Sequence, residues 1–446
     1  MAGDISTVAP AGRRLLCVYQ HAPTPGAPGI YRHRRLFAGL VRRGWTVDVV
    51  STPRNYMSGE MPDRYRRRGL VTEKIDGIDH HWVWSPGGIH RSRLSRAANY
   101  GAFALASALR ALTLPRPDVV MISSPPLTVA PLGPLLARRF GCPWILEVRD
   151  IWPESAVSVG WLRRQSVAYR VLEEVARRTT ERADLVLVPT PGLEPLVRAH
   201  GAQSIVTLTG AVTPRPPAAA RRAAVRARLG VSDAECLFLY LGAIGVANDL
   251  DTLVEAFKRV PPEVQARIVV AGDGSGRQAL AETLAAQRLD RLTLLPAIPR
   301  DAVDDLLAAA DVGLHLLRAD PVFESALPSK VLDYLGAHLP FITTVGGLPA
   351  QIALAGGGGA VRSGGELAEA IERWSDMPAE ERRRRGEQAF AYGQREYGIE
   401  ARVARLEALL VELLAGRPQA RERNPALVQV NLDVPVDPPG RFRRKI

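Results

Sequence analysis

The chain has 446 residues, of which 46% are hydrophobic and 23% charged, and it carries a formal net charge of +12. This length exceeds what one ordinary hydrophobic core organises, so the sequence predicts two domains with additional segments. The three cysteines lie far apart and accompany no CxxC or histidine-rich spacing, so neither a disulfide framework nor a metal site is predicted.

No stretch of the sequence has the character of a leader or of a membrane span. The opening stretch, MAGDISTVAPAGRR, lacks an apolar segment before its basic pair. The longest uncharged run, 119–137, is interrupted by prolines, whereas a spanning helix needs about 20 consecutive apolar residues. The sequence therefore predicts a cytoplasmic protein.

Short apolar runs in the first half alternate with longer amphipathic stretches. Near-continuous apolar strands separated by helices are typical of a parallel sheet that is covered on both faces. We therefore expect a doubly wound α/β domain over residues 1–212. Its expected strands are RLLCVY, WTVDVVS, PDVVMIS, PWILEV and ADLVLVP.

Two loops in this half carry candidate site residues. The loop HAPTPGAPGIYRHRR follows the first expected strand, and Gly26 and Gly29 would let its backbone face a cleft. The stretch EVRDIWPES brings Arg149, Asp150 and Glu154 to the carboxyl end of a strand, where doubly wound folds carry their chemistry. A solvated charged loop explains this second stretch equally well.

A change of composition separates the two halves. Residues 213–230 are rich in proline and then in alanine and arginine, which indicates a linker and a short helix over 213–235. A second series of strands and helices predicts another doubly wound domain over 236–375, and two such domains would face a cleft between their strand ends. Its expected strands are CLFLYLG, ARIVVAG, RLTLLP, DVGLHLL and PFITT.

Glycine turns follow two strands of the second domain. In LYLGAIGVANDLD, Gly242 and Gly245 stand between a strand and a helix, an arrangement that suits an anion but also serves tight turns. In VVAGDGSGR, the pattern G-x-G-x-G lacks the close of a dinucleotide fingerprint, so NAD or FAD binding is not predicted.

Lysine is rare in this chain, since only four of the 58 basic residues are lysine. One of them, Lys330, follows Pro328 and Ser329 at a predicted helix start, where proline fits and serine would cap the helix. Asp333 lies three residues later and shares its helix face. Either the two form an exposed ion pair, or Lys330 meets a diphosphate while Asp333 binds ribose hydroxyls.

Beyond these domains, two amphipathic helices are expected over 376–415, where their apolar faces would pack back onto the body. The segment 416–446, with its prolines and mixed charges, is expected to form a loose tail.

The order of these motifs resembles the nucleotide-sugar domain of GT-B glycosyltransferases of family 4. The stretches that carry the resemblance are GAIGVANDLDTLVEAF, VVAGDGSGR, LLPAIPRDAVDDLLAAADVGLHLL and ALPSKVLDYLGAHLPFI. RDIWPES resembles the branch of the family that builds bacterial surface polysaccharides, and the similarity runs from about residue 14 to 415. The resemblance implies a GT-B fold, no metal or other cofactor, and transfer of a sugar from a nucleotide diphosphate donor, mostly with retention of configuration.

The resemblance also implies that the second domain holds the donor and the first holds the acceptor. Asp333 falls where the family has the ribose-binding second glutamate of its E-x7-E motif, and Lys330 falls where this branch has a lysine near the diphosphate. The expected catalytic residues are Asp150, Arg149 and Lys330, and no metal ligands are expected. The expected donor-binding residues are Gly242, Ala243, Gly245, Gly272, Asp273, Gly274, Glu324, Ser325, Leu327, Pro328, Ser329 and Asp333, and those on the acceptor side are Gly26, Gly29, Tyr31 and Glu154.

Three departures from the family pattern bear on these expectations. Asp333 is one methylene shorter than the usual glutamate, and Ser325 stands where the family has its first glutamate, with Glu324 one position off. The arginine and lysine that many relatives carry in the first glycine loop are absent from GAIGVANDLD, so more weight falls on Lys330. Arg149 stands where the family has its catalytic-region histidine, so no general base is assigned.

These features favour a glycosyltransferase that moves a hexosyl or N-acetylhexosaminyl group, preferably from a UDP-sugar, to a saccharide or lipid-linked acceptor in cell-surface polysaccharide synthesis. A nucleotide-sugar 2-epimerase of the same architecture is the alternative, and it would release a free nucleotide sugar without an acceptor. A basic nucleic-acid-binding protein is disfavoured, because no helix-turn-helix and no interleaved aromatic and basic strand motif is present.

The excess positive charge lies in the expected acceptor domain. Residues 1–212 contain 28 basic and 16 acidic residues, a net charge of +12, whereas residues 213–446 contain 30 of each. Two segments combine arginines with an amphipathic pattern, YRHRRLFAGLVRRGW and RSRLSRAANYGAFALASALRAL. They are either solvated helix faces or a surface for an anionic membrane, which would place the protein peripherally on the inner face of the cell membrane.

Overall fold

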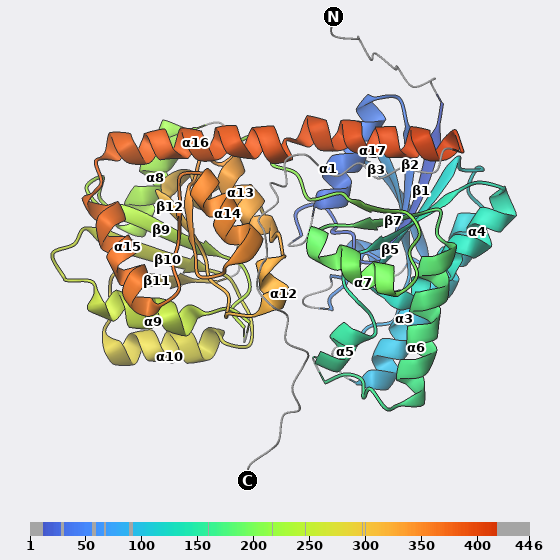
Figure 1. Ribbon diagram of the computed structural model, residues 1–446, viewed down its shortest axis with the longest axis horizontal. Coiled ribbons are helices and arrows are strands. Elements are labelled where there is room, and N and C mark those ends of the chain that lie inside the picture. The colour runs from blue at the N-terminus through green and yellow to red at the C-terminus, as the bar shows by residue number, and fades with distance from the viewer. Residues whose placement is uncertain are drawn as a thin grey trace, which may run out of the picture.

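The computed structural model describes residues 12–27, 31–55, 59–66, 68–88, 92–158, 160–215, 217–245, 247–296, 298 and 300–416. Within these residues the chain forms two α/β units that lie side by side, and a long pair of helices runs across both of them (Figure 1).

The sheet of the first unit has eight described strands in the order β3-β4-β2-β1-β5-β6-β7-β8. Neighbouring strands are parallel, except that β3 and β4 form an antiparallel hairpin at one edge. Nearly every residue of the central strands is buried, which explains their continuous apolar sequences. The strands are β1 (Arg14–Tyr19), β2 (Thr46–Ser51), β3 (Leu70–Ile75), β4 (Ile78–Val83), β5 (Val119–Ser124), β6 (Trp144–Val148), β7 (Leu185–Val188) and β8 (Ile205–Thr207).

Helices cover both faces of this sheet. One face packs against α3, α4, α6 and α7, and the other packs against α1, α2 and the last helix, α17. The helices of this unit are α1 (Arg32–Arg42), α2 (Asp63–Arg66), α3 (Arg93–Leu112), α4 (Leu132–Phe140), α5 (Glu154–Ser158), α6 (Val167–Arg182) and α7 (Glu194–Ala199), with short 3-10 turns η1 (Leu127–Val129) and η2 (Pro191–Leu193).

The second unit contains a parallel sheet with the described order β11-β10-β9-β12-β13-β14. One face packs against α9, α10 and α15, and the other packs against α8, α11, α13, α14 and α16. The strands are β9 (Cys236–Leu241), β10 (Ala266–Ala271), β11 (Leu292–Leu295), β12 (Val312–His315), β13 (Phe341–Thr343) and β14 (Gly359–Ala360). The helices of this unit are α8 (Ala219–Leu229), α9 (Leu250–Arg259), α10 (Arg277–Gln287), α11 (Arg300–Ala309), α12 (Pro321–Glu324), α13 (Ser329–Gly336), α14 (Gly347–Ala355), α15 (Gly364–Asp376) and α16 (Ala379–Tyr397), and the chain ends in α17 (Ile399–Leu414) on the first unit.

The chain passes between the two units twice, and the two crossing segments lie next to each other. The Val212 N–H donates to the Tyr397 carbonyl at 2.7 Å, and Val212 also pairs with Gly398, which separates α16 from α17. The outgoing linker and the returning helix therefore run side by side at the junction.

The last helix packs on the first unit although it comes last in the sequence. Val403 of α17 lies so close to Gly39 of α1 that a Cβ on Gly39 would overlap its side chain. Glu407 accepts hydrogen bonds from Arg43 at 2.9 Å and from the Trp45 indole at 3.2 Å. Of the two final helices, α16 packs on the second unit and α17 on the first (Figure 1).

The expected fold class, two doubly wound α/β sheets, is confirmed. Four strands have no counterpart in the sequence analysis, namely β3, β4, β8 and β14. Residues of β3 alternate between exposed and half-buried, β4 carries two histidines, and β8 and β14 are very short. None of them presents the continuous apolar run by which the other strands were predicted.

Candidate active site between the two sheets

Two glycine loops at the carboxyl ends of β9 and β10 pack backbone against backbone. Gly242 has a φ of +123°, and its N–H donates to the Ala271 carbonyl at 3.0 Å. A Cβ on Gly272 would overlap the Gly242 carbonyl oxygen, and one on Gly274 would overlap that of Ile244. Glycine at these positions therefore lets the two loops lie against each other.

The amides of the first loop are largely engaged within the protein. The Ile244 N–H donates to the Asp273 carbonyl at 2.8 Å, and the Gly245 N–H donates to Asn248 Oδ1 at 3.3 Å. The Asp273 carboxylate accepts from the Gly274 N–H at 2.8 Å. A diphosphate could accept hydrogen bonds from these N–H groups only if their existing hydrogen bonds broke. The loops therefore serve mainly to support the side chain that lies beside them.

That side chain is Lys330, which reaches the first glycine loop from the start of α13. Its buried Nζ lies 4.0 Å from the centroid of the Tyr240 ring and 3.3 Å from the position of a Cβ on Gly242. Nζ has no hydrogen-bond partner among the described residues. Burial lowers the pKa of Lys330 from 10.5 to about 7. A buried ammonium without an anion is energetically costly, so this position indicates an anion site.

The groups that face Lys330 are uncharged. Burial, and next the charge of Lys330, lower the pKa of His315 on β12 to about 3, and its Nδ1 pairs with Thr343 Oγ1 at 2.9 Å. The Tyr240 hydroxyl donates to the Ala243 carbonyl at 2.6 Å, which places Ala243 in the same loop. Burial also raises the pKa of Tyr240 and Tyr334, so both phenols stay neutral.

Asp333 lies one turn further along α13 and faces arginines. Its side chain is buried, and Oδ1 accepts from Arg215 Nη2 at 2.7 Å, while Arg35 of α1 lies 3.9 Å away. Arg215 also donates to Asp304 Oδ1 at 2.7 Å. The alternative of an exposed pair between Lys330 and Asp333 is therefore wrong, because the ammonium is buried and Asp333 pairs with the linker arginine.

The start of α13 also differs from the expectation. Pro328 occupies the N-cap position with φ −64° and ψ 145°, and no side chain caps the helix. Ser329 is the first helical residue and is exposed, so the expected Ser329 cap is wrong. Capping requires the polar side chain one position earlier, before the backbone turns helical. Leu327 packs beside the hydrophobic core under this helix.

Residues around the expected first glutamate lie at the junction of the two units. Glu324 ends α12 and packs against the start of α14, where a Cβ on Gly347 would overlap its carbonyl. Ser325 touches the first unit, because a Cβ on Gly192 would overlap its side chain. Gly192 follows β7, so loops beyond the carboxyl ends of strands from both sheets meet here.

In the first unit, Arg149 packs over an aromatic ring at the ends of β1 and β6. Its guanidinium carbon lies 4.7 Å from the centroid of Tyr19, and Nη2 donates to the Pro125 carbonyl at 3.1 Å. Burial, and next Arg149, lower the pKa of His21 to about 3, so this imidazole is neutral. The described contacts of Arg149 stay within the first unit and do not reach Lys330.

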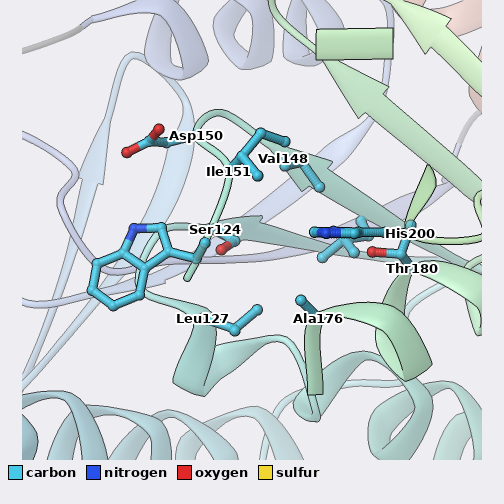
Figure 2. Close-up of a pocket in the computed structure, with 10 residues that line it drawn as sticks. Ser124, Leu127, Val148, Asp150, Ile151, Ala176, Thr180 and His200 are labelled. Carbon is cyan, nitrogen blue, oxygen red and sulfur yellow. The ribbon is translucent and has the colours of Figure 1, made fainter. Parts of the chain in front are cut away.

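Asp150 follows Arg149 and stands at the surface, where the Ser155 hydroxyl contacts its carboxylate. The loop after it covers a small pocket, and Figure 2 shows Asp150 pointing away from the apolar side chains Leu127, Val148 and Ile151. The free volume of the pocket is only about 10 Å³, room for about one water molecule, and it is lined mainly by apolar residues together with Thr180 and His200. Such a lining suits packing of the loop better than binding of a polar sugar.

The remaining acceptor-side candidates hold the first unit together. The Tyr31 hydroxyl donates to the Ala27 carbonyl at 2.7 Å and closes the loop that contains Gly26, whose φ is +77°. Glu154 accepts from the Tyr169 hydroxyl at 3.0 Å within the same unit. Gly29 lies outside the described residues.

The sequence analysis missed a buried carboxylate in the first unit, two residues before Arg149. Glu147 on β6 is fully buried and accepts from Arg32, from His33 Nε2 at 2.5 Å and from Ser123 Oγ at 2.6 Å. Burial opposes its ionisation, but His33 and Arg32 hold its pKa well below the usual range. Arg32 also donates to the Leu208 carbonyl at 2.6 Å, so the cluster fixes the start of α1. The signal for it was an acid inside the apolar strand PWILEV.

Two negative findings apply to the described part of the chain. No group of three His, Cys, Asp or Glu side chains there is arranged to hold a metal ion. Among the same residues, no helix combines the length and apolar character needed to cross a bilayer.

Comparisons with known proteins agree with this architecture. Residues 29–210 match the glycosyl transferase 4-like domain, and residues 222–392 match the glycosyl transferases group 1 model. WbjE of Pseudomonas aeruginosa, described as a glycosyltransferase, is 26% identical over 52% of the chain and 58% of its own length. WcaI of Escherichia coli, described as a colanic acid biosynthesis glycosyl transferase, is 26% identical over 72% of the chain and 80% of its own length. HepE of Anabaena in complex with UDP-glucose has the same fold, with a TM-score of 0.63 and 15% identity over 90% of this chain and 100% of its own.

Proposed function

The chain belongs to the glycosyl transferases group 1 family, and from this premise we propose that it transfers a sugar from a nucleotide diphosphate donor to a saccharide or lipid-linked acceptor in cell-surface polysaccharide synthesis. The descriptions of WbjE and WcaI support this role, and the UDP-glucose bound to HepE supports a UDP-sugar as donor. The transferred group is a hexosyl or N-acetylhexosaminyl residue, and its configuration is retained.

The observation that carries this proposal is the buried Lys330 ammonium, which has no partner among the described residues. When the sugar leaves, negative charge develops on the departing diphosphate, and a fixed cation stabilises that charge most strongly where water is excluded. Lys330 is held for this role between the Tyr240 ring and the Gly242 loop. The proposed departure of the diphosphate is metal-independent, because the cation is supplied by the protein.

The two units have different parts in this proposal. The second unit binds the donor, with Asp333 contacting the ribose, and the first binds the acceptor near Arg149 and Asp150. Because Asp333 already pairs with Arg215, the ribose hydroxyls would share its carboxylate with this arginine or displace it. The proposal assigns no general base.

The first test is a calorimetric screen of UDP-, GDP- and ADP-sugars against the wild type and Lys330→Ala. We expect a UDP-sugar to bind the wild type, and the substitution to weaken UDP binding at least ~10-fold, since a charge-assisted bond contributes about 1.5–3 kcal/mol. Uridine, which has no phosphate, should bind both proteins equally. Unchanged UDP affinity in Lys330→Ala would remove this residue from the donor site.

The ribose contact is tested with Asp333→Asn, for which Arg215→Gln is the matched control. A 2′,3′-dideoxy nucleotide should lose less affinity on Asp333→Asn than on the wild type, because the mutant has already lost the hydroxyl contact. Arg215→Gln removes the ion pair but keeps the carboxylate, so its discrimination should resemble that of the wild type. Equal losses on all three proteins would count against the ribose contact.

Transfer is separated from epimerisation by supplying the donor alone. An epimerase would convert the nucleotide sugar into its 2-epimer, and a transferase would consume it only with an acceptor or slowly by hydrolysis. The assay follows the nucleotide sugar by chromatography. Accumulation of a new nucleotide sugar would overturn the proposal.

A further inference from the structure

Exposed apolar side chains concentrate on one helical layer of the first unit. Among the described residues, eleven large hydrophobic side chains are exposed, and seven of them lie on α3, α4 and α6, three of the four helices that cover one face of the first sheet. We call this surface the α3–α4–α6 face. Its seven exposed members are Leu94, Leu105, Leu109, Leu112, Leu135, Val167 and Val171.

The longest helix of this face is apolar on both sides. Phe103 and Ala111 of α3 are buried against the sheet, as in an ordinary surface helix. The opposite side, which should carry charged residues if it faced only water, is apolar instead. Between Arg96 and Arg110 its exposed residues are Ala97, Ala98, Gly101, Leu105 and Leu109. This stripe extends over several turns of the helix without a charged side chain.

The same region carries an excess of arginine. From residue 84 to 140 the sequence contains seven arginines and one acidic residue. That acid, Asp118, accepts from the Arg14 N–H at 2.6 Å. Arg93 in the first turn of α3 and Arg138 and Arg139 in the last turn of α4 are exposed, whereas Arg91 lies outside the described residues. The α3 and α4 part of the face therefore combines apolar side chains with arginines, whereas α6 also carries Glu173, Glu174 and Glu181 among its arginines.

We propose that the α3–α4–α6 face docks on an anionic lipid surface. The leucine and valine side chains enter the boundary between headgroups and acyl chains, while the arginines contact lipid phosphates. Charge complementarity favours this occupant, because α3 and α4 contain arginines and no acid, and α6 adds four arginines against three glutamates. The inference goes beyond the proposed transfer reaction and does not depend on the identity of the donor.

The position of this face relates it to the expected acceptor loop. Arg93 donates to the Gly160 carbonyl at 3.3 Å, and the guanidinium of Arg96 lies 3.6 Å from the centroid of Trp161. The segment that follows Asp150 and α5 is thereby attached to the start of α3 (Figure 1). A chain docked through this face would present that loop near the lipid headgroups, where a lipid-linked acceptor would be presented.

The apolar part of the proposal is tested with the full-length protein and two pairs of substitutions. Leu105→Ser with Leu109→Ser alters the face, and Leu70→Ser with Leu354→Ser alters two other exposed leucines, one on β3 and one on α14 of the second unit. Binding is measured by co-sedimentation with vesicles of phosphatidylcholine alone and of phosphatidylcholine with phosphatidylglycerol. We expect the wild type to bind the anionic vesicles, the first pair to bind at least ~10-fold more weakly, and the second pair to bind like the wild type.

The charged part is tested with Arg138→Gln and Arg139→Gln, for which Arg228→Gln and Arg383→Gln on the second unit are the control. The first pair should reduce binding to anionic vesicles, and added salt should release the wild type. Thermal unfolding and UDP-sugar calorimetry on every variant show whether the fold and the donor site are intact. A failure of docking can thereby be distinguished from a failure of the proposed transfer reaction.

Equal binding to neutral and anionic vesicles, no vesicle binding, or equal losses in the control pairs would overturn the proposal. So would a self-associated chain that the Leu105 and Leu109 substitutions convert to monomers, since the face would then be an interface between copies.

Discussion

Lys330 is a cation that the described part of the protein leaves without an anion, and its burial should oppose folding. Its pKa in the folded chain is about 7, against 10.5 as the ordinary value. Between these two pH values the unfolded chain binds more protons than the folded one, so stability should rise with pH across this window. The destabilisation is fully present below pH 7 and fades towards pH 10.5.

We therefore predict that Lys330→Met raises the melting temperature while it removes diphosphate binding. Methionine fills a similar volume without a buried charge, so the gain at pH 6 should be several degrees and should shrink at higher pH. Calorimetry of unfolding at several pH values checks this, and Lys258→Met, at an exposed ion pair, is the control. A lower melting temperature for Lys330→Met would mean that the ammonium has a stabilising partner.

The same ammonium predicts a pH dependence of donor binding. Above pH 7 a growing fraction of Lys330 is neutral in the free protein, and a bound diphosphate would raise its pKa again. Binding of a UDP-sugar should therefore take up a proton, and its affinity should fall as pH increases from 7 to 9. Tyr240 and His315, which face Lys330, stay neutral in this range, as does Tyr334 on the same helix, so they do not mask the effect. Calorimetry in buffers of different ionisation enthalpy measures the proton, and its absence would contradict the prediction.

At the scale of elements, the two glycine loops depend on each other's backbones. Gly274 has a φ of +147°, and a Cβ there would overlap the Ile244 carbonyl, whereas a Cβ on Gly276 would make an ordinary contact at 3.4 Å. We predict that Gly274→Ala weakens donor binding by displacing the loop that supports Lys330, while Gly276→Ala changes it little. UDP-sugar calorimetry together with circular dichroism checks that the loss is local. Equal affinities in both variants would show that the first loop does not depend on the second.

At the scale of the whole molecule, Gly192 and Ser325 set how closely the two units approach. A Cβ on Gly192 would overlap the Ser325 side chain, so Gly192→Ala should separate the loops that meet there. We predict a larger radius of gyration in solution scattering and lower transfer activity, with donor binding unchanged. Adding Ser325→Gly removes the obstructing side chain and should restore the radius of gyration of the wild type. If the double variant stays as expanded as Gly192→Ala, the contact does not control the separation.

The sequence by itself determined the central strands of the two sheets. The central strands had to be parallel and covered on both faces because their apolar runs are continuous, and this property is local. The place of Lys330 near a donor phosphate was implied by the family resemblance and stays a prediction, whereas the structure shows its Nζ beside Gly242 and the Tyr240 ring. Strands without an apolar run, such as β3 with its alternating exposure, gave no comparable signal.

Only the tertiary structure decided which partners the charged groups have and which faces stay open. Asp333 pairs with Arg215, 118 residues away, and Glu147 pairs with His33, 114 residues away. Sequence periodicity describes which residues share a face of one element, but it does not say which distant element covers that face. For the same reason α3, apolar on both sides, could not be divided into a buried and an exposed face until the sheet beneath it was known.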